Sequence, residues 1–345
     1  MDNTIEKQAF EAFRNSSVLI TGAAGMVSRN AIRVIQRINR EYGLGISVIA
    51  HVLDQTQADC FFSKPVDGVD ISVITGDIRT LQVEGQVDYI IHTAGITGGS
   101  KQHIDFPMTT ISVAIDGTRQ VLEIAKEKKT KAVVYLSSLE IYGKSPDSKE
   151  SICETDGGYI DPVNVRSSYS ESKRMCENIC ASYTKQFGVP CVIARLTATF
   201  GYGVSIRDNR VFAQFARSVM DKQDIVLKST GGTVRNYCDA EDTASALLWL
   251  LAKGTPGEAY NIANMDTEIS IKDMAELFIS MYPESGISLK FDIQEDATRL
   301  GYNAEMRNVL NSQKLMDLGW RPRYGMKDMI NHLVDAMNES KKLEA

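Results

Sequence analysis

The stretch that decides the fold reads Ser17-Val-Leu-Ile-Thr-Gly-Ala-Ala-Gly-Met-Val27. A short apolar run ends in a glycine-containing turn, a helical pattern follows to about residue 42, and a second apolar run covers residues 46–53. The order strand, turn, helix, strand is a βαβ unit. Gly22 permits a tight turn and Gly25 lets the backbone approach a pyrophosphate, while the helix N-terminus offers free N–H groups. The residues predicted to hold a dinucleotide phosphate are Gly22, Ala24, Gly25, Met26 and Val27.

Outward from this unit, strand and helix patterns continue to alternate as far as residue 200. Strands are predicted at 71–75, 89–92, 132–137 and 189–196, and helices at 113–129 and 170–187. Such alternation is typical of a parallel sheet covered on both faces. The later pattern is irregular, with helices predicted at 211–222, 240–252, 271–281 and 326–342. We therefore predict an α/β fold: a Rossmann-type doubly wound parallel sheet with a smaller mixed α/β C-terminal substrate-binding region.

The end of the second predicted strand indicates which dinucleotide binds. Asp54 stands there, where a carboxylate accepts hydrogen bonds from both ribose hydroxyls and repels a 2′-phosphate. Leu53, rather than an arginine, precedes it, which favours NAD over NADP. Further contacts to the cofactor are expected from residues that follow the next two strands: Asp77, Ile78, Thr93, Ala94 and Gly95.

The cofactor site sets the expected domain boundaries. Residues 1–16 are predicted to be a short polar helical extension. Residues 17–200 form the NAD-binding domain, to which 236–262 return, and residues 201–235 and 263–345 form the substrate-binding region.

A tyrosine and a lysine four residues apart form the candidate catalytic pair. Tyr169 and Lys173 lie on one face of a predicted helix. An ammonium beside a phenol favours the phenolate, so we expect the pKa of Tyr169 to be lowered towards neutrality. Tyr169 would then remove a proton from a substrate hydroxyl, and both side chains would also contact the cofactor. Ser138, at the carboxyl end of a strand, would share that proton, and Ser137 would face the cofactor.

Composition and charge exclude several other classes of protein. The chain has 345 residues, a net charge of −6 and 43% hydrophobic residues, which argues against a disordered chain and against a nucleic-acid binder. The six cysteines and four histidines are too scattered for a metal site, and we expect reduced thiols in a cytoplasmic protein. The first seven residues do not resemble a signal peptide, and the longest apolar stretch, 244–252, is too short to span a membrane.

Taken together, these motifs resemble the extended short-chain dehydrogenase/reductase family, the NAD-dependent nucleotide-sugar epimerases, dehydratases and decarboxylases. The resemblance rests on Thr21-Gly-Ala-Ala-Gly-Met-Val27, Ser137-Ser138 with Tyr142-Gly143, the Tyr169/Lys173 pair, and Arg235-Asn-Tyr-Cys-Asp-Ala-Glu-Asp242. It implies a nucleotide-diphosphate sugar as substrate, with Arg235 on the diphosphate. Arg210 and Arg307 are further candidates for the same anion.

The resemblance also bears on the reaction, which would open with oxidation of the sugar to a ketone. Similar dehydratases and decarboxylases carry a glutamate where this chain has Glu140, which would orient groups or act as a base. The 4,6-dehydratases have a proton-donating aspartate just before it, and this chain has Leu139. We therefore expect epimerisation or decarboxylation rather than 4,6-dehydration. Ala114 and Ala198 replace asparagines common in relatives, which indicates an altered substrate pocket.

Two alternatives remain at this point. One is an NAD(P)H-dependent reductase of a non-nucleotide carbonyl compound, and the other is a cofactor-binding sensor without catalysis. In similar proteins, the helices that correspond to 113–129 and 170–187 pair with those of a second subunit, so a homodimer held by a four-helix bundle is expected. Cys176 and Cys180 would be buried in the second of these helices.

Overall fold

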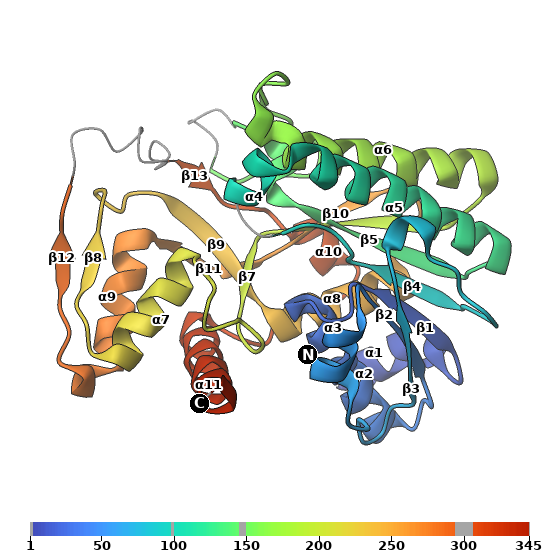
Figure 1. Cartoon of the computed structure of the whole chain (residues 1–345), viewed down its shortest axis with the longest axis horizontal. Helices are drawn as coiled ribbons and strands as arrows, with labels where there is room; N and C mark the ends of the chain where they lie inside the picture. Colours follow the sequence, from blue (N-terminus) through green and yellow to red (C-terminus); the bar gives the residue numbers. More distant parts are fainter. Residues whose placement is uncertain (1–2, 98–99, 145–149, 294–305, 345) are drawn as a thin grey trace.

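The computed structural model describes residues 3–97, 100–144, 150–293 and 306–344, and is built on one large parallel sheet. Seven strands lie in the order β10-β6-β5-β4-β1-β2-β3 (Figure 1), and each neighbouring pair is parallel. Their bounds are β1 Ser17–Thr21, β2 Ser47–Val52, β3 Ile71–Thr75, β4 Tyr89–His92, β5 Ala132–Ser138, β6 Cys191–Leu196 and β10 Ala259–Ile262. The predicted doubly wound sheet is confirmed.

Helices cover both faces of this sheet because side chains alternate along each strand. In β1, Val18 and Ile20 pack towards α2 (Met26–Tyr42) and α8 (Ala240–Lys253). Leu19 faces the opposite way, towards α5 (Pro107–Lys128) and α6 (Ser168–Phe187). The last two helices lie side by side, as expected (Figure 1). Cys176 and Cys180 of α6 are fully buried between helix and sheet, as predicted.

A smaller lobe holds the second hydrophobic core. Its four-stranded sheet consists of β7 (Ala198–Phe200), β9 (Val234–Asp239), β11 (Asn264–Ser270) and β13 (Arg307–Asn308). A two-stranded sheet is formed by β8 (Ile225–Leu227) and β12 (Leu289–Phe291). The helices of this lobe are α7 (Val211–Asp221), α9 (Ile271–Met281) and α11 (Met326–Glu344), and α10 (Gln313–Asp317) contacts β10. The chain thus crosses between lobes several times: β7 joins the small sheet, and α8 and β10 return to the large one.

Two helices begin earlier than their apolar patterns predict. α2 begins at Met26 instead of about residue 30, because the glycine turn leads directly into the helix from Gly25. α5 begins at Pro107 instead of 113, since proline suits the first helical position, where its missing N–H would have no partner. Three short helices were not predicted: α3 (Gln55–Phe62), α4 (Ser100–Asp105) and α10.

The N-terminal extension is helical, but the expectation that it is merely polar is wrong. It forms α1 (Asn3–Phe10) and a 3₁₀ turn (Glu11–Phe13). Phe10 and Phe13 are completely buried, with ring centroids 5.7 Å from Trp249 and 4.7 Å from Tyr89 respectively. Two aromatic residues among many polar ones give no helical stripe, yet both pack in the core of the large sheet. None of the described helices is both long and apolar enough to cross a membrane.

Candidate active site

The predicted phosphate cradle lies where the strand order of the large sheet reverses, between β1 and β4. Open parallel sheets bind ligands at such a switch point, beyond the carboxyl ends of the strands. Gly22 has φ +66°, and a Cβ there would lie 2.9 Å from the Cα of Ala94, which follows β4. Gly25 precedes the first turn of α2 in an extended conformation, so Met26 and Val27 open the helix over the turn. The chain therefore leaves no room for a side chain at Gly22.

Buried hydroxyl groups hold the two loops of this cradle together. Thr93 Oγ1 donates to the carbonyl oxygen of Thr21 (2.5 Å) and lies 2.7 Å from Ser28 Oγ. The ring of His92 bridges Thr21 Oγ1 (2.8 Å) and Thr118 Oγ1 (3.2 Å). Burial, with a smaller contribution from Lys173, lowers the pKa of His92 to about 3. His92 is therefore a neutral support for the turn, a role that the sequence analysis missed.

At the adenosine end, the predicted contacts divide into two groups. Asp54 follows β2 as predicted and caps α3, where its Oδ1 accepts from the N–H of Gln57 (2.9 Å). Asp77, by contrast, is held by Arg79, whose Nη2 donates to its Oδ2 (2.5 Å) and lowers its pKa. Ile78 is buried against Gly117 in α5. The side chains of Asp77 and Ile78 thus already have partners within the protein, and their contact with the cofactor stays a prediction.

These features fit a dinucleotide. The position of Gly22 excludes any side chain from the turn, the N-terminus of α2 opens beside it, and Asp54 stands at the next strand end. When bound there, NAD would supply an acceptor for hydride.

Three of the predicted catalytic residues converge at the carboxyl end of β5. Ser138, the last residue of that strand, forms a side-chain hydrogen bond with Tyr169 on α6. Lys173, one turn further along α6, lies with its Nζ 5.9 Å from the centroid of the Tyr169 ring and donates to the carbonyl oxygen of Leu136 (2.6 Å). A Cβ on Gly95 would be 4.0 Å from the same Nζ. Lys173 therefore lies next to the loop after β4 that is predicted to contact the cofactor.

The pKa of Tyr169 differs from expectation. Burial and the negative charge of Glu140 raise it to about 12, and the hydrogen bond from Ser138 and the charge of Arg166 oppose this rise without reversing it. The reason is the placement of Lys173, which is buried, has its own pKa lowered by burial, and is directed at a backbone carbonyl. In this structure Lys173 therefore does not lower the pKa of the phenol to neutrality.

Glu140 lies at the site but is held by donors on neighbouring segments. Arg166 Nη2 donates to both of its carboxylate oxygens at 3.0 Å, and Ser170 Oγ donates to Oε2 at 3.1 Å. Arg166 Nε also donates to Ser100 Oγ (3.0 Å) on α4. His103 of the same helix stacks on the ring of Tyr169, with centroids 4.6 Å apart. Arg166 and His103 were not predicted, although Arg166 stands only three residues before Tyr169.

The hydroxyl of Ser137 is directed into the protein interior. Its Oγ donates to Glu177 Oε1 (2.5 Å), and Glu177 pairs with Arg195 Nη2 (2.7 Å) in a buried network between α6 and β6. The predicted contact between Ser137 and the cofactor would therefore come from its backbone, and it stays a prediction.

The three arginines that are candidate ligands of the diphosphate differ in whether their guanidinium groups already have partners within the protein. Arg235 lies on β9, and its Nε is buried without a hydrogen-bond partner. Arg307, on the adjacent strand β13, is paired with Glu268 (2.6 Å), and Arg210 with Asp208 (2.6 Å). A buried, unpartnered guanidinium nitrogen favours an anionic ligand, so only Arg235 of the three keeps this feature.

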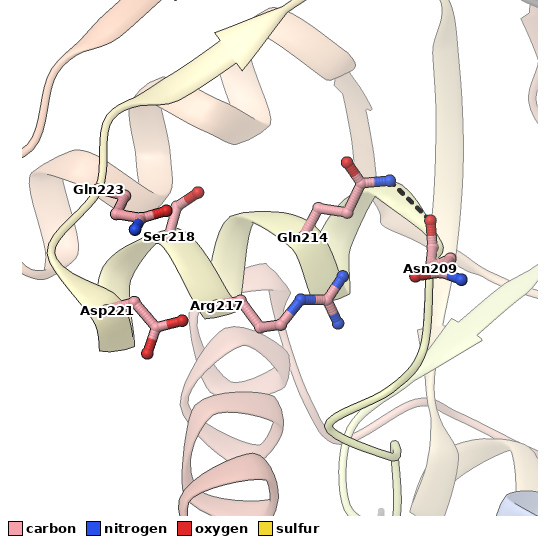
Figure 2. Close-up of a pocket in the computed structure, with 6 residues that line it drawn as sticks. All are labelled: Asn209, Gln214, Arg217, Ser218, Asp221 and Gln223. Atoms are coloured by element: carbon pink, nitrogen blue, oxygen red, sulfur yellow. Dashed lines mark hydrogen bonds between the residues drawn. The ribbon is translucent and has the colours of Figure 1, made fainter.

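A separate surface pocket of about 400 Å³ lies along α7 (Figure 2). Two of its polar side chains are already paired: Gln214 Nε2 donates to the carbonyl oxygen of Asn209 (2.7 Å), and Arg217 Nη1 to those of Ile206 and Asp208. This pocket contains none of the candidate catalytic residues. In the described part of the chain, no three histidine, cysteine, aspartate or glutamate side chains are grouped to hold a metal ion.

The fold and this site together define a dinucleotide-binding enzyme of the Rossmann type with a tyrosine–lysine pair. A family model, the NAD dependent epimerase/dehydratase family, matches residues 18–263, and the chain belongs to this family of enzymes. The predicted family and its NAD-dependent chemistry are thereby confirmed.

Individual relatives are more distant. The chain is 27% identical over 339 residues to a dTDP-D-glucose 4,6-dehydratase of Bos taurus, covering 94% of this chain and 89% of the relative. It is 26% identical to a UDP-glucuronic acid decarboxylase 1 of Xenopus tropicalis, covering 92% and 71%. Among solved structures, an epimerase of Methanothermobacter thermautotrophicus superposes with a TM-score of 0.79 at 20% identity, covering 99% and 98%. The last likeness shows the fold alone.

Proposed function

We propose that this protein converts a nucleoside-diphosphate sugar through a transient keto-sugar and completes the reaction by epimerisation or decarboxylation. Tyr169 accepts the proton of the sugar hydroxyl, Ser138 shares it, and Lys173 holds the phenol and the cofactor loop in register. The observation that carries the proposal is the convergence of Tyr169, Lys173 and Ser138 beside the glycine cradle, with Arg235 left unpaired.

The surroundings of Ser138 argue against 4,6-dehydration, although 4,6-dehydratases are among the relatives. Loss of water from the sugar needs a group that protonates the departing hydroxyl. The residue after Ser138 is Leu139, whose side chain carries no proton to donate and packs against a small apolar cluster with Ile141. Glu140, the other candidate, has both oxygens engaged by Arg166. Epimerisation and decarboxylation do not need that acid.

The cofactor and the subunit arrangement belong to the same proposal. Asp54 and the exposed Leu53 favour NAD, since neither of the two residues between β2 and α3 is basic and could pair with a 2′-phosphate.

The exposed sides of α5 and α6 are proposed to pair with a second subunit as a four-helix bundle. Light scattering of the purified protein tests this, and a monomeric mass would contradict it.

The test of the reaction uses purified protein and a panel of UDP-, dTDP-, CDP- and GDP-sugars, including uronates. Products are analysed by mass spectrometry, with an unchanged mass expected for epimerisation and loss of carbon dioxide for decarboxylation. Protein-bound NAD is measured in the same preparation after denaturation.

Three outcomes would contradict the proposal. Loss of water from a hexose would show dehydration. Consumption of NADPH by a carbonyl compound, with no turnover of any nucleotide sugar, would indicate a reductase. Bound NAD with no reaction in the whole panel would point to a cofactor-binding sensor.

A further inference from the structure

Arg166 connects three segments around the catalytic tyrosine. It lies in a 3₁₀ turn (Val165–Ser167) immediately before α6, its Nη2 donates to both oxygens of Glu140 after β5, and its Nε donates to Ser100 at the start of α4. The Arg166 and Glu140 side chains are only 29% and 37% exposed. Tyr169 stands three residues further along, and His103 of α4 stacks on its ring, so Arg166 ties together segments that contact or adjoin the catalytic tyrosine.

Charged and titratable groups reach the phenol of Tyr169 from every neighbouring element. Lys173 comes from α6 itself, Tyr135 from β5, and His103 from α4, where burial lowers its pKa and keeps the ring neutral. Glu140, from the 3₁₀ turn Leu139–Tyr142, and Arg166, from the turn before α6, bring opposite charges. Glu140 raises the pKa of Tyr169, after burial the largest cause, while Arg166 lowers it. Because the two charges contact each other, each limits the effect of the other.

We propose that Arg166 is a positioning residue for Tyr169: it offsets the field of the Glu140 anion at the phenol and holds that carboxylate so that Tyr169 accepts the substrate proton. This rests on the proposed function for the identity of the base. If Arg166 only held these segments together, its replacement could loosen the site. The pKa of Tyr169 would then not depend on the sign of the charge at positions 140 and 166.

The experiment reads the ionisation of this one tyrosine without any substrate. 3,5-Difluorotyrosine is placed at position 169, where its fluorine NMR shift follows the phenol from acid to phenolate in protein saturated with NAD. Compared with the parent, Arg166→Gln should raise the midpoint by about one pH unit, because Glu140 is left uncompensated, and Glu140→Gln should lower it by about one unit. Arg166→Lys, which keeps the charge, should stay near the parent, and the double variant Arg166→Gln/Glu140→Gln should return close to it.

Arg40→Gln is the matched control, since it removes the same charge from a surface ion pair with Asp67 and should leave the midpoint unchanged. The proposal is overturned if Arg166→Gln moves the midpoint no more than Arg40→Gln, or if Arg166→Gln and Glu140→Gln move it in the same direction. If Arg166→Gln does not fold, an unchanged midpoint in Glu140→Gln overturns the proposal by itself. A protein that converts no nucleotide sugar still answers this question, so the two proposals fail separately.

Discussion

At the scale of the residue, what a charged side chain can do depends on which partners already hold it. Asp77 and Asp208 each accept from the backbone N–H and the guanidinium of an arginine two residues later, Arg79 and Arg210. The sequence analysis took one member of each pair as free to bind ligand. An aspartate followed two residues later by arginine in a turn is a local pair, so the spacing itself indicated that these side chains were occupied. Arg235 has no such neighbour and keeps a buried nitrogen unpaired.

The first prediction concerns the base. Replacement of Tyr169 by phenylalanine should reduce turnover by at least about a hundredfold while NAD stays bound, because only the group that accepts the proton is lost. The measurement is the rate on whichever nucleotide sugar the panel identifies, together with NAD released on denaturation. Tyr183→Phe is the control: it lies on the same helix and hydrogen-bonds Glu123 at the surface, so activity should be kept. Near-normal turnover by the Tyr169 variant would refute the assignment.

At the scale of the element, the periodic segments were predictable and the locally determined ones were not. β1, β3, β4 and α9 have the predicted bounds, since the runs of residues that favour a strand or a helix end at the same positions. α3 was missed because its stability comes from the Asp54 cap rather than from a long apolar stripe. β7 and β13 are two or three residues long and are held by pairing with β9, which no local pattern reveals.

The second prediction concerns the turn between β1 and α2. Gly22→Ala should lower the free energy of unfolding by about 1–3 kcal/mol and reduce NAD affinity, because it combines a left-handed backbone with a Cβ pressed on Ala94. Gly43→Ala, at the other end of α2, is a matched control: its φ is +63° and nothing lies within 4 Å of the added Cβ. It should cost about 1 kcal/mol and leave NAD binding unchanged. Urea denaturation and NAD titration of both variants provide the comparison, and equal losses of NAD affinity would contradict the crowding argument.

The third prediction concerns the attachment of α1. Glu6, 1% exposed, accepts from Arg37 on α2 (2.7 Å) and from Arg323 before α11 (2.6 Å). Burial opposes its ionisation, but the two arginines outweigh burial and lower the pKa of Glu6. Glu6→Gln should therefore destabilise the protein by about 3 kcal/mol, because Arg323 loses its counter-charge and Arg37 keeps only Glu41.

Urea denaturation measures this loss, with Glu11→Gln as the control. Glu11 pairs with Arg14 on the exposed side of the same segment, so its removal should change stability very little. A Glu6 variant as stable as the Glu11 variant would mean that the buried charges contribute nothing to the docking of α1.

At the scale of the whole molecule, the two lobes are joined through the loop that follows β7. Arg29 and Asn30 of α2 donate to the carbonyl oxygens of Gly203 and Tyr202, both at 2.8 Å. The ring of Tyr202 in turn stacks on His332 of α11, with centroids 4.4 Å apart. His332 Nδ1 lies 2.9 Å from Oδ2 of Asp239, which is fully buried at the end of β9. This chain of contacts connects the helix of the phosphate cradle to the last helix of the smaller lobe.

The fourth prediction follows from that buried ion pair. Burial alone would lower the pKa of His332, but the hydrogen bond and charge of Asp239 outweigh it and raise the pKa above its ordinary value near 6.5. A raised pKa means that the folded protein binds the proton more tightly than the unfolded chain. The stabilisation is therefore complete below about pH 6.5 and is lost as the pH rises through the folded value. His332→Gln should cost about 1–2 kcal/mol at pH 6 and less at pH 9.

The difference in unfolding free energy between wild type and His332→Gln, measured by urea denaturation from pH 5.5 to 9, isolates this pair from other titrating groups. Asp242 is one such group, since burial raises its pKa to about 7 and gives wild-type stability a dependence of the same sign. Its contribution is present in both proteins and cancels in the difference. Lys341 lies on α11, like His332, and forms an exposed ion pair with Asp221 at the end of α7. Lys341→Gln, which breaks that pair, should show no comparable trend. If the His332 difference is flat or grows with pH, then the charge of the imidazolium is not what joins α11 to β9. The ring contacts of His332, stacked with Tyr202 and edge-on with Tyr324, would then be the contacts that hold the lobes together.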